Sequence, residues 1–266
     1  MANRIDDKFT GLKNKKHGGF IPFIVAGDPN LSVTKKLIIE FANKGADVIE
    51  LGVPFSDPVA DGVTIQAAAE RALQNPISVR NILEIVGEIR RENCDVPIIL
   101  FSYFNPILQF GLEKFAESAV EAGIDGILVT DLVPEEAEEF RAILATKDLK
   151  LIMLAAPTSS DERLRKICEK ASGFVYAVSR AGVTGAQTAL SVDAKKLVER
   201  LRKFTDLPIA VGFGISSAAQ VLETWKYADA AVVGSAIVAE IAKNSEATKE
   251  DLVKRIGEFA ANLLPK

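Results

Sequence analysis

Three carboxylate side chains lie close together in the segment 50–66, which reads E-L-G-V-P-F-S-D-P-V-A-D-G-V-T-I-Q. Glu50 interrupts an apolar run typical of a buried strand, where an unpaired ionised carboxylate would be costly. A glutamate in that position is either paired or functional. Asp57 and Asp61 follow in a loop that contains proline and glycine. A strand end with one carboxylate, followed by a loop with two more, is where an α/β enzyme keeps its acid–base groups.

The two aspartates of this segment also have an interpretation that involves no chemistry. Asp57-Pro58 and Asp61-Gly62 are ordinary turn dipeptides, which occur in the surface loops of many proteins. A metal ion bound by Asp57 and Asp61 is a further alternative, but no third ligand stands out, so we expect no metal. Spacing alone leaves the acid–base and the turn interpretations of the aspartates open.

The composition argues against several classes of function. The 266 residues are 48% hydrophobic, which suits a sizeable core in one large α/β domain or two small ones. The net charge is −4, and no run of lysine or arginine is combined with aromatic residues, so we expect no nucleic-acid partner. No apolar run approaches about 18 residues, and none lies at the start of the chain. We therefore expect neither a membrane span nor a signal peptide.

The positions of cysteine, histidine and lysine narrow the chemistry further. Cys94 and Cys168 are far apart without metal-binding spacing, which is typical of reduced thiols in a cytoplasmic protein. His17 is the only histidine, which argues against a histidine-based triad or a multi-histidine metal site. No lysine ends a predicted strand, since Lys150 begins one, and this argues against a Schiff-base aldolase or a pyridoxal-phosphate enzyme.

Strand-like and helix-like segments alternate eight times along the chain. Most of the strand-like segments are short continuous apolar runs, which indicates strands buried on both faces of a parallel sheet. The predicted strands are 20–26, 47–52, 97–102, 126–130, 150–155, 174–178, 208–212 and 230–234. Predicted helices include an N-terminal helix at 3–14 and amphipathic stretches at 34–44, 78–91, 112–121 and 193–203.

A two-unit echo in the sequence predicts how these strands are arranged. Similar text precedes or begins the second, fourth, sixth and eighth strands: G-A-D-V-I, G-I-D-G-I, S-G-F-V-Y and A-D-A-A-V. Eight strand–helix units with this echo predict an α/β fold, a closed (β/α)8 TIM barrel. A doubly wound open sheet is the alternative, but it usually has fewer strands and a glycine-rich fingerprint in its first turn. No linker is visible, so we assign a single domain to residues 1–266.

Polar side chains follow several predicted strands, at the face where barrels keep their active sites. Tyr103 and Asn105 come after the third strand and Asp131 comes after the fourth, on the same face as Glu50. The connection after the sixth strand begins S-R-A-G-V-T-G-A and is expected to extend to about Val192, which is long for such a loop. It is interpreted either as a mobile lid or as an idle surface loop.

Glycine-bearing turns late in the chain predict a phosphate site. They are Thr184-Gly185, the segment 212–216 and Gly234-Ser235, and the last two follow the seventh and eighth strands. Gly234-Ser235 then opens an extra short helix at 236–242, and such a helix after strand eight is a common phosphate site in barrels. Glycine lets backbone N–H groups approach an anion closely. We therefore expect a phosphorylated substrate.

The segment 50–66 closely resembles the signature of tryptophan synthase α-subunits. S-R-A-G-V-T-G-A, G-F-G-I-S and G-S-A-I-V resemble further blocks of that family in the same order, and the similarity extends nearly from end to end. One departure is Val63, where many members have proline, and it leaves the carboxylates in place. The resemblance implies a lyase of tryptophan biosynthesis that cleaves indole-3-glycerol phosphate to indole and glyceraldehyde 3-phosphate. The reaction is a retro-aldol cleavage that needs no cofactor.

The same resemblance implies roles for individual residues. Glu50 and Asp61 match the two catalytic carboxylates of the family. The expected substrate-binding residues are an apolar indole pocket (Phe23, Phe101, Leu128, Phe213), a tyrosine beside the glycerol portion (Tyr176) and a phosphate cradle (Gly185, Gly214, Gly234, Ser235). Thr184 is expected to hydrogen-bond Asp61 when the lid closes. Pro54, Asp57 and Asn105 match segments that contact a tryptophan synthase β-subunit in an allosteric α2β2 heterotetramer.

Two other functions remain open from the sequence. A phosphosugar isomerase or epimerase would use the same phosphate cradle, although an apolar lining for a flat bicyclic ring would then be superfluous. A non-enzymatic subunit kept to activate a partner is the other alternative, although both carboxylates are present.

Overall fold

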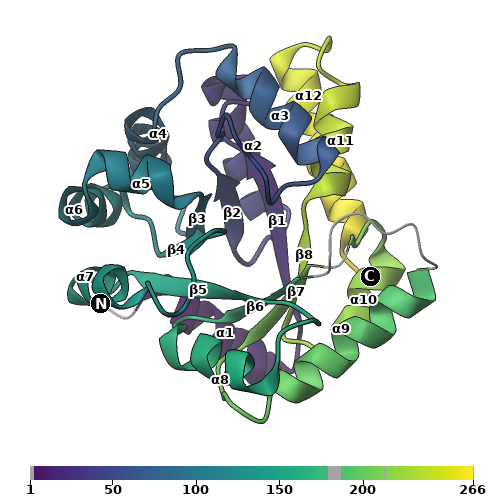
Figure 1. The fold of residues 1–266 in the computed structure, drawn as a ribbon. Coiled ribbons are helices and arrows are strands. Elements are labelled where there is room, and N and C mark those ends of the chain that lie inside the picture. The colour runs from purple at the N-terminus through teal and green to yellow at the C-terminus, as the bar shows by residue number, and fades with distance from the viewer. Residues whose placement is uncertain (1–2, 179–186, 213, 266) are drawn as a thin grey trace.

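A closed barrel of parallel strands organises the residues that the structure, a computed structural model, describes: 3–178, 187–212 and 214–265. The strands follow one another around the barrel in chain order, and β8 pairs back with β1 (Figure 1). The predicted (β/α)8 barrel is thereby confirmed, and the open-sheet alternative is wrong. The strands are β1 (Gly19–Val25), β2 (Ile49–Gly52), β3 (Ile98–Ser102), β4 (Gly126–Val129), β5 (Lys150–Ala155), β6 (Val175–Val178), β7 (Ile209–Gly212) and β8 (Ala230–Val233).

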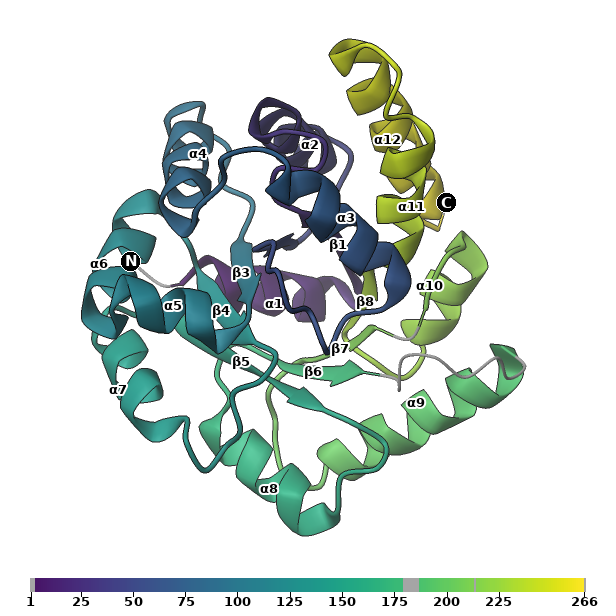
Figure 2. The same ribbon diagram turned by 45° about the horizontal axis from the view of Figure 1, so that its top comes forward.

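Helices surround these strands as an outer ring, except for the first helix, which lies across one end of the barrel (Figure 2). Among the described residues, none of the helices is long and apolar enough to cross a membrane. The helices are α1 (Arg4–Lys15), α2 (Leu31–Asn43), α3 (Val63–Leu73), α4 (Val79–Arg91), α5 (Phe104–Phe110), α6 (Leu112–Ala122), α7 (Glu138–Thr146), α8 (Asp161–Lys170), α9 (Gln187–Leu201), α10 (Ala218–Thr224), α11 (Ser235–Lys243) and α12 (Lys249–Leu263). The expected N-terminal helix and the extra short helix after strand eight correspond to α1 and α11.

Two helices differ from the sequence-based expectation. The connection after β6 does not extend to about Val192, because α9 already begins at Gln187. Alanine, leucine and glutamine are good helix formers, and they continue the helix on the N-terminal side of Asp193, where we expected it to begin. The helix α5 was not expected at all, and it places Asn105 on a helix directly after β3.

The inner and outer faces of the strands pack into separate apolar clusters. Side chains that point outward pack against the ring of helices, whereas alternate side chains fill the barrel interior. The helix α1 closes the end of the barrel where the strands begin, since Ile5, Phe9 and Leu12 pack into the interior cluster. The opposite end, where the strands finish, carries the loop that contains Asp57 and Asp61.

Three aspartates and a serine explain the echo in the sequence. Each lies just before an even-numbered strand and accepts a hydrogen bond from a backbone N–H near the start of the preceding odd-numbered strand. The pairs are Phe20 N–H with Asp47 at 2.9 Å, Ile98 N–H with Asp125 at 2.8 Å, Leu151 N–H with Ser172 at 2.8 Å and Ile209 N–H with Asp229 at 2.7 Å. The repeated text therefore marks a repeated connection between neighbouring strands.

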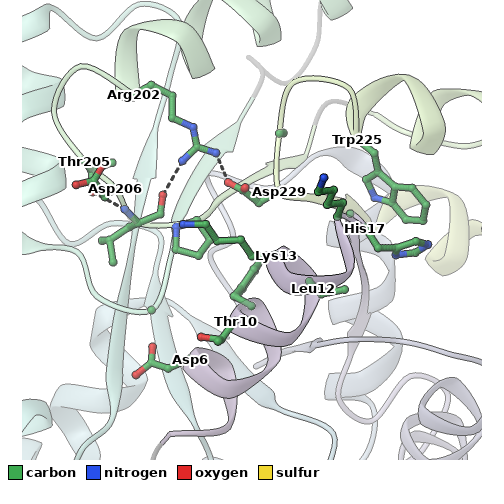
Figure 3. Close-up of a pocket in the computed structure, with 17 residues that line it drawn as sticks. Asp6, Thr10, Leu12, Lys13, His17, Arg202, Thr205, Asp206, Trp225 and Asp229 are labelled. Atoms are coloured by element: carbon green, nitrogen blue, oxygen red, sulfur yellow. Dashed lines mark hydrogen bonds and ion pairs between the residues drawn. The ribbon is translucent and has the colours of Figure 1, made fainter.

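The end of the barrel that α1 closes also carries a cavity of about 1000 Å³ (Figure 3). It lies between α1 and the turns that lead into β1 and β6–β8. Its polar groups hold those turns together: Arg202 pairs with Asp229, and the Trp225 indole N–H donates to the Gly19 carbonyl at 2.9 Å. The His17 ring lies 4.5 Å from the Trp225 ring. We interpret this cavity as structural, because the N-terminal face of such a barrel generally serves stability.

Candidate functional site

Glu50 lies inside the barrel, and its side chain is fully buried. Along β2, Ile49 and Leu51 pack outward among the helices, so the alternation of side chains turns Glu50 inward. Phe23 on β1 and Ile99 on β3 are its neighbours across the two ladders. Neither carboxyl oxygen has a hydrogen-bond partner among the described residues. Of the two sequence interpretations of Glu50, the paired one is therefore wrong for this part of the chain.

The surroundings of Glu50 favour its protonated form. Burial raises the pKa of this carboxyl group well above its ordinary value of 4.5. Burial also raises the pKa of the Tyr176 hydroxyl well above its ordinary value of 10.0, and Glu50 adds to this rise when it is ionised. A carboxylic acid that keeps its proton in an apolar site can donate it to a reacting atom and later take another back.

Asp61 lies in the loop between β2 and α3, where Tyr103 holds it. The Tyr103 hydroxyl donates to Asp61 Oδ2 at 3.1 Å and accepts from the Ala60 N–H at 2.9 Å. Burial raises the pKa of Asp61, and the hydrogen bond from Tyr103 opposes that rise. Burial also raises the pKa of Tyr103 to about 12, so the tyrosine remains a donor at neutral pH. The Asp61 N–H closes a turn onto the Pro58 carbonyl at 3.0 Å, so Asp61 is at once a turn residue and a site residue.

A cavity of about 350 Å³ opens between Asp61 and the ends of the late strands. This volume is in the range of pockets that hold small ligands. The rings of Phe23 and Phe101 meet edge to face at 5.3 Å on one side of it. Leu128 does not line the cavity and is instead buried in the interior cluster against Phe101. The residues that line the cavity are Phe23, Asp61, Ile65, Phe101, Tyr176, Gly212, Gly214, Ile215, Ser216, Val232, Gly234, Ser235 and Ala236.

The far side of this cavity offers backbone N–H groups. Helix α11 begins at Ser235, and its N-cap Gly234 has no side chain that could satisfy the first N–H groups. Gly214 has a φ of +64°, and a Cβ there would meet nothing within 4 Å, so the backbone is open to the cavity. A helix N-terminus beside an open glycine turn is suited to an anion. The expected residues Thr184, Gly185 and Phe213 lie outside the described residues.

Several residues of the site were not assigned a role from the sequence. Ile65, Ile215 and Ser216 line the cavity, and all three belong to blocks that the resemblance had already singled out. From the sequence, Gly212 was interpreted only as part of a glycine turn. In the structure, the Tyr176 side chain leaves no room for a larger residue at this position. A Cβ at Gly212 would lie 2.3 Å from the Tyr176 hydroxyl oxygen. Tyr103 was placed on the correct face, although nothing in its sequence context indicated a contact with Asp61.

The expected partner-contact residues lie in neighbouring loops at the same end of the barrel. Asp57 is exposed in the loop after β2, where it accepts from the Ser56 hydroxyl at 2.5 Å, and Asn105 is exposed on α5 after β3. Pro54, by contrast, is buried. Around Asp57 and Asn105 lie exposed apolar side chains: Val59 is 88% exposed, Val63 is 81% exposed and Leu108 is 51% exposed.

Val63 is the first residue of α3, a position where proline is also favoured, so the departure from the family leaves the start of the helix in place. In the part of the chain that the structure describes, no group of three or more potential ligand side chains could hold a metal ion.

Replacing Glu50 by glutamine is expected to change how stability depends on pH. Above the ordinary carboxyl pKa of 4.5, the unfolded chain releases a proton that the folded chain still holds on Glu50. The free energy of unfolding of the parent therefore falls as the pH rises from there towards the folded-state pKa, and Glu50→Gln escapes this loss. Thermal unfolding measured from the ordinary carboxyl pKa of 4.5 upward should show a difference in favour of the variant that grows with pH until the folded-state pKa is reached. The exposed Glu246→Gln is the control, and a pH-independent difference for Glu50→Gln would contradict the assignment.

Comparison with known proteins identifies a relationship over nearly the whole chain. The family model described as "Tryptophan synthase alpha chain" matches residues 9–263. The tryptophan synthase alpha chain of Caulobacter sp. strain K31 is 45% identical over 261 residues, which cover 97% of this chain and 95% of the relative.

Solved structures agree with the sequence comparison. The tryptophan synthase subunit alpha of Legionella pneumophila str. Paris has a TM-score of 0.91 and 37% identity, covering 99% of this chain and 97% of the other. A chain from a structure on mutual activation of the tryptophan synthase α2β2 complex of Pyrococcus furiosus has a TM-score of 0.84 and 41% identity, covering 91% and 97%. The match extends through the strands, the carboxylate loop and the late glycine turns, and the chain therefore belongs to the tryptophan synthase alpha chain family.

Proposed function

We propose that this chain cleaves indole-3-glycerol phosphate to indole and glyceraldehyde 3-phosphate, as the α-subunit of tryptophan synthase in tryptophan biosynthesis. The observation that carries the proposal is Glu50, a buried carboxyl group with a raised pKa and no hydrogen-bond partner among the residues that the structure describes. It lies beside Phe23, which lines a cavity with aromatic side chains on one side and helix N–H groups on the other. An indole ring and a phosphate on one substrate match these two sides.

The proposed reaction moves one proton onto the substrate and takes one away. Glu50 donates its proton to the indole carbon that carries the glycerol chain, and positive charge develops on the indole nitrogen. The bond between that carbon and the glycerol chain then breaks, and its electron pair returns to the ring. The neighbouring hydroxyl becomes the aldehyde as its proton passes to the Glu50 carboxylate, so the enzyme returns to its starting state.

Asp61 is proposed to stabilise the charged intermediate. Its carboxyl group lines the cavity, and Tyr103 occupies only Oδ2. Among the described residues, Oδ1 has no hydrogen-bond partner and is available to the indole N–H as the ring becomes positive. Asp61 therefore binds the transition state more strongly than the neutral substrate, which is what lowers a barrier.

One substitution at each carboxylate tests its proposed role in the cleavage assay. Glu50→Gln keeps the shape of the side chain but has no proton to exchange, so kcat should fall by about 10²–10⁴-fold. Asp61→Asn removes the negative charge and should lower kcat by about 10²-fold. Indole release from indole-3-glycerol phosphate is the measurement, with Asp95→Asn, exposed at the other end of the barrel, as the control. A folded Glu50→Gln protein with parent-like turnover would refute the assignment of Glu50.

We also propose that the phosphate of the substrate binds between Gly214 and the N-terminus of α11. The open backbone at both positions supports this, as does the exposure of Ser235 to the cavity. Phosphate binding there would supply binding energy remote from the reacting carbon and fix the orientation of the substrate. Gly185 is assigned to the same cradle by resemblance alone.

Introducing a carboxylate at Gly234 tests the phosphate site. Gly234→Asp should weaken the binding of glycerol phosphate by about tenfold or more, because like charges then meet at the helix N-terminus. Free indole should bind as it does to the parent. Gly234→Ala is the control, since a Cβ there makes only ordinary contact with Phe23 at 3.4 Å. Unchanged affinity of Gly234→Asp for glycerol phosphate would place the phosphate elsewhere.

We further propose that a tryptophan synthase β-subunit docks over the loop after β2 and over α5, in an α2β2 complex. The exposed apolar side chains Val59, Val63 and Leu108 support this, together with the exposed positions of Asp57 and Asn105. Docking there would contact the loop that carries Asp61. It would favour a closed, water-excluded site and would receive an apolar product directly.

Titration with a cognate β-subunit tests the partner. The chain alone should be a weak lyase, and the β-subunit should raise its cleavage rate. By reciprocity, glycerol phosphate should tighten the complex. Val59→Asp should require more β-subunit for half-maximal stimulation than the parent, whereas Leu222→Asp, an equally polar change at an exposed position on α10, should not. Absence of stimulation of the parent would reject the partner.

Two further expectations stay predictions. We propose a cytoplasmic location, supported by the free thiols of Cys94 and Cys168. We also propose that residues 1–266 form a single domain.

A further inference from the structure

The tip of the loop after β2 is exposed in the part of the chain that the structure describes. Val59 is 88% exposed, and Ala60 and Gly62 are exposed as well. The turn is closed by the Asp61 N–H and the Pro58 carbonyl at 3.0 Å. Packing alone does not fix such a segment, so its conformation depends on the polar groups that reach it.

Gln66, in the first turn of α3, reaches back to this turn. Its side-chain amide donates to the Asp61 carbonyl at 2.8 Å and lies 3.4 Å from the Pro58 carbonyl. Both partners are carbonyl oxygens, so only the NH₂ end of the amide can face them. Gln66 is half-buried and does not line the cavity. Its contacts therefore serve the loop and not a ligand.

Gln66 and Tyr103 hold opposite sides of the same residue. Tyr103 binds the Asp61 carboxylate and the Ala60 N–H from the barrel side, at 3.1 Å and 2.9 Å. Gln66 binds the Asp61 carbonyl from the helix side. With both in place, the backbone and the side chain of Asp61 are fixed together. Without Gln66, the Asp61 carbonyl loses this hydrogen bond, and the residue is held by the turn to the Pro58 carbonyl and by the contacts of Tyr103.

We propose that Gln66 is a positioning residue that keeps the Asp61 carboxylate facing the cavity in the free chain. This inference rests on the proposed function, because it assumes that the hydrogen bond between Gln66 and the Asp61 carbonyl supports catalysis by Asp61. Loss of Gln66 is expected to lower kcat and to leave KM unchanged, because Gln66 does not line the substrate cavity and acts only through the position of Asp61.

The test replaces Gln66 by methionine, which is similar in length and helix propensity but cannot donate a hydrogen bond. Hydrogen exchange should be faster in peptides that cover residues 56–66, which include the Ala60 and Asp61 N–H groups. The kcat for indole-3-glycerol phosphate should fall by about two- to tenfold, as expected for one net hydrogen bond, with KM unchanged. Gln74→Met, at the exposed C-terminal end of the same helix, is the matched control and should leave exchange and turnover as in the parent.

The two readouts separate this inference from the proposed function. Hydrogen exchange needs no substrate, so it decides whether Gln66 holds the loop even if the parent releases no indole, a result that would refute the proposed function. Parent-like exchange and parent-like kcat in Gln66→Met would overturn the positioning role. A loss confined to KM would also overturn it, because it would place Gln66 in substrate binding. Thermal unfolding of both methionine variants identifies any global loss of stability.

Discussion

This site depends on one constraint: a carboxylic acid inside an apolar barrel that has no hydrogen-bond partner in the described part of the chain. Glu50 is surrounded by apolar side chains on its own ladder, and ionising it there would be costly. The neutral form is therefore favoured, and that form is the proton donor the reaction needs. A strand with ladder partners on both sides holds the group in place despite its cost to stability. The position of Glu50 inside the barrel therefore accounts both for its rigid backbone and for the raised pKa of its carboxyl group.

The second acid is supported in a different way. Asp61 lies on a loop whose tip is exposed, and its position depends on a few hydrogen bonds rather than on packing. A contact made outside the chain can therefore reach Asp61 far more easily than it can reach Glu50. This division is suited to a regulated enzyme. Glu50 is held in place by the barrel, whereas the position of Asp61, and with it the completeness of the site, depends on contacts with the loop.

Much of the architecture could be predicted from the sequence, since strands buried on both faces leave continuous apolar runs that end at proline, glycine or polar residues. The short helix α5 was missed because it has only seven residues and its N-cap, Tyr103, makes no side-chain cap hydrogen bond. Leu128 was matched to the indole pocket by motif position, but its side chain is fully buried and does not line the cavity. The contacts of Tyr103 and Gln66 with Asp61 could not be predicted, because they depend on how loops from different strands meet in space.

The hydrogen bonds that explain the sequence echo also affect how the chain reaches its fold. Their partners are separated by only 27, 27, 21 and 20 residues, so each closes a loop of modest entropic cost. Contacts that are local in the sequence form faster than those between distant segments. Neighbouring strands are thereby favoured to assemble as pairs, whereas β1 and β8, from opposite ends of the chain, meet only when the barrel closes. Four polar side chains remote from the catalytic face therefore favour one order of assembly over the others.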